Sequence, residues 1–71
     1  MDWTTVFTTN SEIEAAFVQG LLQNSDIPAV VMNQSDSAYK FGDIKIMTTT
    51  EKVMDANVVI KEYLENRTQN D

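Results

Sequence analysis

The pattern of hydrophobic and polar positions near the start of the chain changes from the period of a strand to that of a helix. Residues 3–8 are rich in β-branched and aromatic side chains, which favour a strand. Ser11 followed by Glu14 is a capping box, in which each residue satisfies a backbone N–H at the start of a helix. Apolar residues then recur every three or four positions, so we expect them to share the buried face of this helix. They are Ile13, Ala16, Phe17, Gly20 and Leu21.

Two further strands are predicted in the middle of the chain. Residues 27–32 form the first, with Pro28 near its start because proline has no N–H to donate to a neighbouring strand. Residues 43–47 alternate in polarity, which places Ile44 and Ile46 on the buried face of the second. The segment between them is a polar loop.

A second helix is expected from Glu51 onward, capped by the threonines at positions 48–50. Its core face is predicted to hold Val53, Ala56, Ile60 and either Tyr63 or Leu64, which recur at helical spacing. Residues 66–71 include no apolar side chain and are interpreted as a polar C-terminal tail. Residues 1–65 are then expected to form a single βαββα domain.

This element order predicts an α/β fold of the α+β plait type, a truncated ferredoxin-like plait without its last strand. Crossover connections are right-handed, and both helices are expected on one face of a three-stranded antiparallel-mixed sheet. We expect residues 3–8 to run parallel to residues 43–47, and residues 27–32 to pair with 43–47 through the loop. The first strand is then an unpaired edge, which invites pairing with another chain.

The face of the sheet away from the helices is expected to carry an apolar patch. Either Trp3 and Phe7 point to the helices, which leaves Val6 and Met47 on the open face, or the strand is turned over and exposes Trp3 and Phe7. Both arrangements leave apolar side chains uncovered. We therefore predict a homo-oligomer, with a dimer favoured and with contacts at Trp3, Val6 and Met47.

Composition and charge exclude several classes of function. The chain has 71 residues with no Cys and no His, and its 11 acidic and 5 basic residues give a net charge of -6. A zinc finger, a thiol nucleophile and a Ser-His-Asp triad are therefore excluded. No Lys or Arg precedes Lys40, which argues against nucleic-acid binding. No apolar run has the length of a signal or a membrane span, so we expect a cytoplasmic protein that binds no membrane, cofactor or metal.

The loop between the second and third strands is the candidate site for a protein partner or ligand. It combines polar anchors with aromatic side chains, although the same residues suit a plain hairpin loop in which Asp36 makes an Asx-turn. A weak carboxylate site at Asp36 and Asp43, and an anion site of Lys40 and Lys45 at a helix N-terminus, are the lesser alternatives. The loop residues selected are Asn33, Ser35, Asp36, Ser37, Tyr39, Lys40 and Phe41.

Glu12 and Glu14 are the remaining pair of candidate chemical groups. Two neighbouring carboxylates can serve as general acid and base. Both residues, however, lie in the first turn of the predicted helix, where a negative charge is stabilised by the positive end of the helix dipole. We therefore interpret them as structural and expect no catalytic residue in the chain.

Several short motifs of the chain are typical of a known family when they occur together. They are Val6-Phe7-Thr8, Gly20-Leu21-Leu22, Asp26-Ile27-Pro28-Ala29, and the loop from Asn33 through Asp36, Ser37 and Tyr39 to Phe41-Gly42. With these motifs, about residues 1–64 resemble the small bacterial "putative signal-transducing protein" family, a domain of unknown function. The resemblance implies a fold similar to the nitrogen-regulatory PII proteins, which are sensors that work through the loop between their second and third strands.

Two functions from different classes follow from these observations. The first is a non-enzymatic regulatory or protein-interaction module that acts through the loop and through self-association. The alternative is a sensor that binds a small ligand, an amino acid or a nucleotide, at an interface between copies. A catalytic function would need a proton shuttle built without His or Cys.

Overall fold

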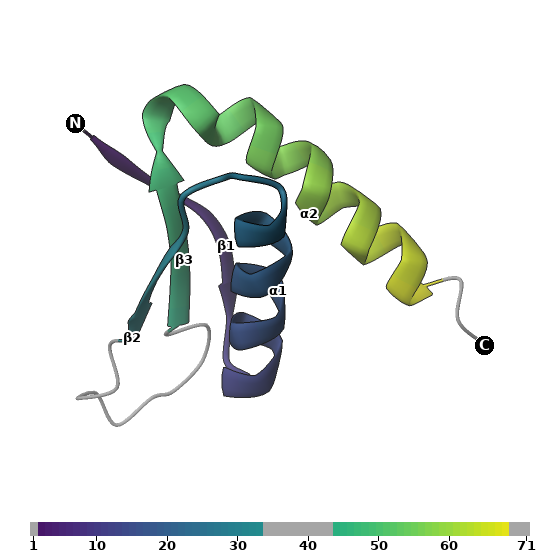
Figure 1. The fold of residues 1–71 in the computed structure, drawn as a ribbon. Helices are drawn as coiled ribbons and strands as arrows, with labels where there is room; N and C mark the ends of the chain where they lie inside the picture. The colour runs from purple at the N-terminus through teal and green to yellow at the C-terminus, as the bar shows by residue number, and fades with distance from the viewer. Residues whose placement is uncertain (1, 34–43, 69–71) are drawn as a thin grey trace.

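The computed structural model describes residues 2–33 and 44–68, which form two helices against one face of a three-stranded sheet (Figure 1). The elements are β1 (Trp3–Thr9), α1 (Glu12–Asn24), β2 (Val30–Asn33), β3 (Ile44–Thr49), a short 3₁₀ turn η1 (Thr50–Lys52) and α2 (Val53–Thr68). This is the predicted βαββα order. The fold is α+β, with the strand order of a truncated plait.

The strand order is β1-β3-β2, and the central strand β3 runs antiparallel to both neighbours. The expectation that the first strand runs parallel to the third was therefore wrong. The helix α1 returns the chain to its starting direction, so β1 and β2 are the strands that share a direction. The reversal after β2 then turns β3 against both of them.

A β-bulge at Val6 decides which face of the sheet each β1 side chain occupies. Thr5 lies opposite Met47 and Phe7 lies opposite Ile46. A step of two residues along β1 therefore corresponds to a step of one residue along β3, which leaves Val6 without a partner position on β3. Neither predicted orientation of β1 is therefore correct, because Trp3 lies on the open face while Phe7 points to the helices. Val6 packs against the core together with Phe7.

The buried face of α1 differs from the predicted one. Ala15, Val18 and Leu22 are buried against the sheet, whereas Ile13 and Phe17 are 84% and 54% exposed. The helix carries two apolar stripes of the same period, so the period alone does not select the one that meets the sheet. In the folded chain, small Ala15 and β-branched Val18 allow α1 to lie close to β3.

The core between helices and sheet otherwise follows the sequence pattern. Ile44 and Ile46 are buried on β3, and Ala56 and Ile60 are buried on α2, as predicted. Tyr63 and Leu64 are partly buried and pack against this core. Ile27 and Ala29 are also buried, although β2 begins only at Val30.

Thr48 and Thr50 bond to other segments of the chain, whereas Thr49 is the N-cap residue of η1. The hydroxyl of Thr48, which is fully buried, donates to the carbonyl of Pro28 at 2.6 Å. Thr49 precedes η1 without a side-chain capping bond, and the backbone N–H of Thr50 donates to the carbonyl of Asp2. The role of Thr48 and Thr50 is therefore to hold the ends of β1, β2 and β3 in register.

The helix α2 continues to Thr68, past the point where the sequence predicted a polar tail at residue 66. Residues 69–71 lie outside the described residues. Within 2–33 and 44–68, no strand follows α2, and β1 pairs only with β3. The position beside β1, which a fourth strand fills in a complete plait, is not filled by these residues.

We predict that Leu22→Ala lowers the free energy of unfolding by about 3 kcal/mol, because it removes a fully buried side chain and leaves a cavity. Ile13→Ala on the same helix should change it by less than about 0.5 kcal/mol, because Ile13 is exposed. Urea denaturation followed by circular dichroism measures both. Equal losses in the two variants would contradict the orientation of α1.

Candidate functional site

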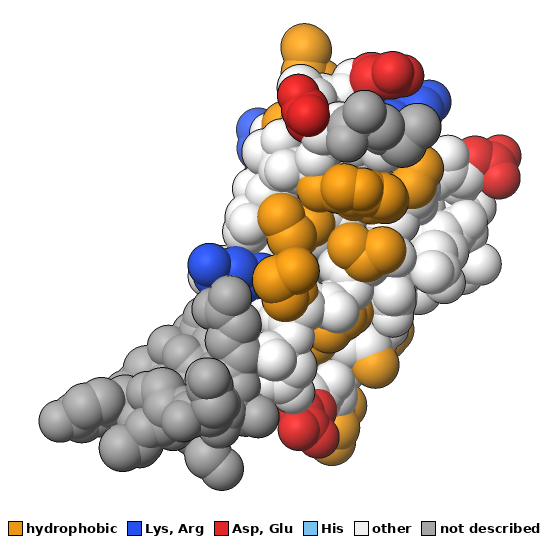
Figure 2. Space-filling model, turned by 90° about the vertical axis from the view of Figure 1, so that its left-hand side faces the viewer, with side chains coloured by type: hydrophobic (Ala, Val, Ile, Leu, Met, Phe, Trp, Pro, Cys, Tyr) orange, Lys and Arg blue, Asp and Glu red, His pale blue; other side chains and the backbone are white. Residues whose placement is uncertain are grey.

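The face of the sheet away from the helices carries an apolar patch formed by Trp3, Val30, Met32 and Met47. The register places Val30 opposite Met47, and Met32 opposite Lys45, on the same face. Trp3 is 42% and Met32 is 45% exposed. Figure 2 shows a band of apolar side chains on this side of the molecule. We refer to these four residues as the open-face patch.

Of the predicted oligomer contacts, Trp3 and Met47 belong to the open-face patch and Val6 does not. The bulge places Val6 against the core together with Phe7. The sequence pattern overlooked Val30 and Met32. It also treated β1 as a regular strand, in which residues 3 and 7 share a face.

Only Asn33 of the candidate loop residues lies in the described chain. It is the last residue of β2, it is exposed, and it pairs with Ile44. Lys45 faces the open side of the sheet with Met32, so it does not lie beside a helix N-terminus as the anion-site alternative required. The remaining loop residues lie outside the described residues: Ser35, Asp36, Ser37, Tyr39, Lys40, Phe41 and Asp43.

The most connected polar group of the described chain is the carboxylate of Glu14, at the N-terminal end of α1. One of its oxygens, Oε1, accepts a hydrogen bond of 2.7 Å from the hydroxyl of Thr9. The other, Oε2, accepts bonds of 2.6 Å from the hydroxyl of Tyr63 and from Nη1 of Arg67. We call these four residues the Glu14 network, which joins β1, α1 and α2.

The ring of Tyr63 contacts two aromatic rings and a guanidinium group. Its ring centroid lies 5.5 Å from that of Phe17 and 6.4 Å from that of Phe7, the second in an edge-to-face arrangement. The guanidinium carbon of Arg67 lies 5.7 Å from the same ring. Tyr63 is therefore held on several sides, with its hydroxyl aimed at Glu14.

The Glu14 network shifts the pKa values of both acids in it. The hydroxyl of Tyr63, followed by that of Thr9, lowers the pKa of Glu14, and the charge of Arg67 acts in the same direction against partial burial. The carboxylate of Glu14 in turn raises the pKa of Tyr63, since it accepts the phenolic proton in a hydrogen bond. At neutral pH the network thus contains an ionised Glu14 and a neutral Tyr63.

The capping box of α1 is only half formed because Glu14 bonds elsewhere. The hydroxyl of Ser11 accepts from the N–H of Glu14, as predicted. The N–H of Ser11 donates to the hydroxyl of Thr9 instead of to Glu14. The sequence interpretation of Glu14 as a dipole-stabilised surface acid missed its role between helices. The available signal was weak: a Tyr and an Arg four residues apart on the other helix.

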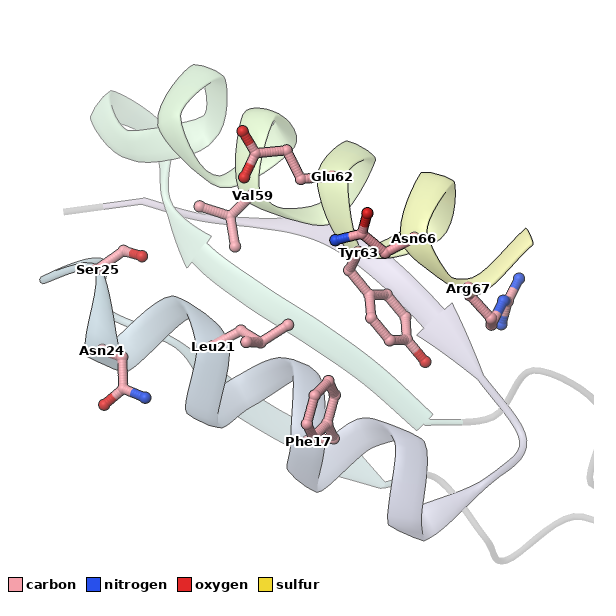
Figure 3. Close-up of a pocket in the computed structure, with 9 residues that line it drawn as sticks. All are labelled: Phe17, Leu21, Asn24, Ser25, Val59, Glu62, Tyr63, Asn66 and Arg67. Carbon is pink, nitrogen blue, oxygen red and sulfur yellow. The ribbon is translucent and has the colours of Figure 1, made fainter. Parts of the chain in front are cut away.

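A groove of about 550 Å³ lies between α1 and α2. Phe17 and Leu21 project from α1, and Val59 and Tyr63 project from α2, toward the space between the helices (Figure 3). Asn24 and Asn66 line it as polar residues, and Glu62 and Arg67 are its charged ones. The apolar stripe that was predicted to be core therefore forms part of a surface groove.

Two further findings concern metals and membranes. In the described part of the chain, no three Asp, Glu, His or Cys side chains group as potential ligands of a metal ion. Neither described helix has the length and apolar character needed to cross a bilayer.

The comparison with known proteins identifies one family. The family model with the description "Putative prokaryotic signal transducing protein" matches residues 3–64. No curated protein and no solved structure matches the chain significantly. The matched range extends from β1 into α2, so it includes the open-face patch and the groove lining except Asn66 and Arg67.

We predict that Tyr63→Phe lowers the free energy of unfolding by about 1–2 kcal/mol, because it removes a hydrogen bond to a charged acceptor. Arg67→Gln should cost less than about 1 kcal/mol, since the side chain of Arg67 is 54% exposed. Thermal and urea denaturation of both variants measure the two losses. A larger loss in Arg67→Gln would show that the ion pair, rather than the phenol, holds Glu14.

The pKa shifts predict two windows of pH-dependent stability. Because the pKa of Glu14 is lowered on folding, its contribution is present above the ordinary value of 4.5 and is lost as the pH falls through the lowered value. Because the pKa of Tyr63 is raised, its contribution is present below the ordinary value of 10.0 and is lost as the pH rises through the raised value.

Urea denaturation across the acid range compares the native chain with Glu14→Gln, and the alkaline range compares it with Tyr63→Phe. The difference in unfolding free energy between the native chain and Glu14→Gln should shrink as the pH falls. The difference between the native chain and Tyr63→Phe should shrink as the pH rises. Glu12→Gln is the control for the loss of a first-turn carboxylate without bonds to α2. A difference that stays constant with pH would contradict the assignment.

Proposed function

The chain belongs to this family of "putative prokaryotic signal transducing proteins", and from that premise we propose that it is a small regulatory or protein-interaction module that self-associates through its open-face patch. The observation that carries the proposal is the uncovered apolar patch on the bare side of the sheet. Contiguous exposed apolar side chains on a polar protein are typical of an interaction surface.

The charge on the open face supports a second copy as the occupant. The chain has a net charge of -6, yet none of the described strand residues that register assigns to this face is acidic. Two copies can therefore approach here without acid facing acid, whereas the acidic helices repel each other. The residues on this face are Trp3, Thr5, Thr8, Val30, Met32, Lys45, Met47 and Thr49.

Size also favours association. A chain of 71 residues without Cys or His forms no disulfide and lacks the usual ligands of a structural zinc ion. Its core supplies only about 3–5 kcal/mol of net stability. Face-to-face packing of two sheets, about 10 Å apart, would bury the patch and add to the stability of each copy.

The proposal includes a role for the segment that joins β2 to β3. This segment continues from Asn33, next to Met32 in the open-face patch. By likeness to PII proteins, we propose that its residues meet a protein partner and that self-association sets how two such segments are presented together. The Glu14 network supports a role without catalysis, since its carboxylate is fully engaged by three donors within the fold.

We predict that sedimentation velocity detects a reversible dimer at micromolar concentrations, and that the emission of Trp3 shifts to shorter wavelength as the dimer forms. Trp3 is the sole tryptophan of the chain and lies in the patch, so this signal is specific. Met47→Lys should raise the dissociation constant at least about tenfold, because it places charge at the centre of the contact.

Val58→Lys is the matched control, because Val58 is an exposed apolar residue on α2, away from the sheet. It should leave the dissociation constant within about twofold. A protein that remains monomeric at high micromolar concentration would contradict self-association. An equal effect of both lysine variants would place the contact elsewhere.

A further inference from the structure

The helix side of the molecule holds a second uncovered apolar surface, separate from the open-face patch. The groove between α1 and α2 has Phe17 and Leu21 on one wall and Val59 on the other. Ile13 precedes Phe17 by one helical turn, and Val58 is the exposed neighbour of Val59. Ile13 and Val58 add exposed apolar side chains on the two helices, although neither lines the groove itself.

The charge near this groove that is not paired within the chain is negative. Arg67 is engaged by Glu14 at 2.6 Å, and Lys52 pairs with Asp55. Glu62 lines the groove, and within the part of the chain that the structure describes no cation lies within ion-pair distance of it. The helix α1 contains no Lys or Arg at all. The groove therefore offers an apolar floor beside an uncompensated negative charge.

We infer that this groove binds an amphipathic helix of a partner protein, with apolar residues on one side and Lys or Arg along its flanks. The inference rests on the proposed function, since it names the class of partner for an interaction module. The walls of the groove are helices whose backbone groups bond within each helix, so an occupant must satisfy its own backbone groups. A helix does so, and its apolar side chains fill the groove.

Charge complementarity distinguishes this partner from a second copy of the chain. The helix α1 contains two acidic residues, Glu12 and Glu14, and no basic residue. The helix α2 contains three acidic residues and two basic residues, Lys61 and Arg67. Either helix of a second copy would therefore bring net negative charge against Glu62. A lysine-flanked helix instead gains attraction at the rim and faster association at low salt.

Two designed peptides test the inference. Each has about 18 residues, with leucines at helical spacing on one face and either lysines or glutamates at the flanking positions. Fluorescence anisotropy with the full chain should show saturable, salt-dependent binding of the lysine peptide, and at least about tenfold weaker binding of the glutamate peptide. Amide resonances of α1 and α2 should shift, and those of the open face should not.

Charge reversal at the groove is the decisive variant. Glu62→Lys should weaken binding of the lysine peptide about fivefold and strengthen binding of the glutamate peptide, because it reverses the charge at the groove. Glu62 is exposed, so its exchange disturbs no packing. Glu51→Lys makes the same charge change on η1, outside the groove, and should alter neither affinity by more than about twofold. Phe17→Ala should weaken both peptides about tenfold, through lost apolar contact.

Four results would overturn the inference: no saturable binding, equal binding of both peptides, equal effects of Glu62→Lys and Glu51→Lys, or resonance shifts on the open face. The Met47→Lys variant separates this inference from self-association. It should bind the lysine peptide with unchanged affinity while its dimer dissociates. Peptide binding by a chain that never dimerises would contradict the proposed self-association and leave the groove assignment intact.

Discussion

The hydrogen bonds of Glu14 hold α1 against α2. The position of α1 determines which of its side chains are buried and which are exposed. A carboxylate in the first turn of α1 accepts from Thr9 on β1 and from Tyr63 and Arg67 on α2. The rotation of α1 that brings Glu14 beside α2 also turns Val18 and Leu22 toward the sheet and Phe17 outward. The bonds to both oxygens of Glu14 are therefore consistent with only one rotation of α1, in which Val18 and Leu22 are buried and Phe17 is exposed.

The bulge in β1 likewise determines which side chains of the sheet are buried and which are exposed. One extra residue reverses the alternation along β1, so that Phe7 joins the core and Trp3 joins the open face. Without it, both aromatic residues would lie on the same side. The bulge thus supplies an aromatic side chain to the core beside Tyr63 and an aromatic side chain to the open-face patch. Two local features, a carboxylate and a bulge, create two distinct uncovered surfaces.

The two surfaces differ in charge, and this difference suits them to different occupants. The described strand residues of the open face are free of acid, which is compatible with a second copy. The groove between the helices is lined by Glu62 and by Arg67, whose charge is paired with Glu14, and the remaining charge of Glu62 is the reason for proposing a basic partner. Under the two proposals, the chain associates with a second copy through one side and binds another protein on the other side. The family description refers to signal transduction and names no mechanism.

The sequence by itself determined the order of the elements, the core face of α2 and the burial of Ile44 and Ile46, because local periodicity and turn residues carry that information. It predicted an apolar patch on the open face of the sheet but left open whether Trp3 or Val6 belongs to it. Only the tertiary structure decided the directions of the strands, the buried stripe of α1 and the partner of Glu14. Each of these depends on contacts between residues far apart in the chain, such as Glu14 with Tyr63 and Thr48 with Pro28. A repeating pattern shows that a face is apolar, but packing against the other elements selects which apolar face is buried.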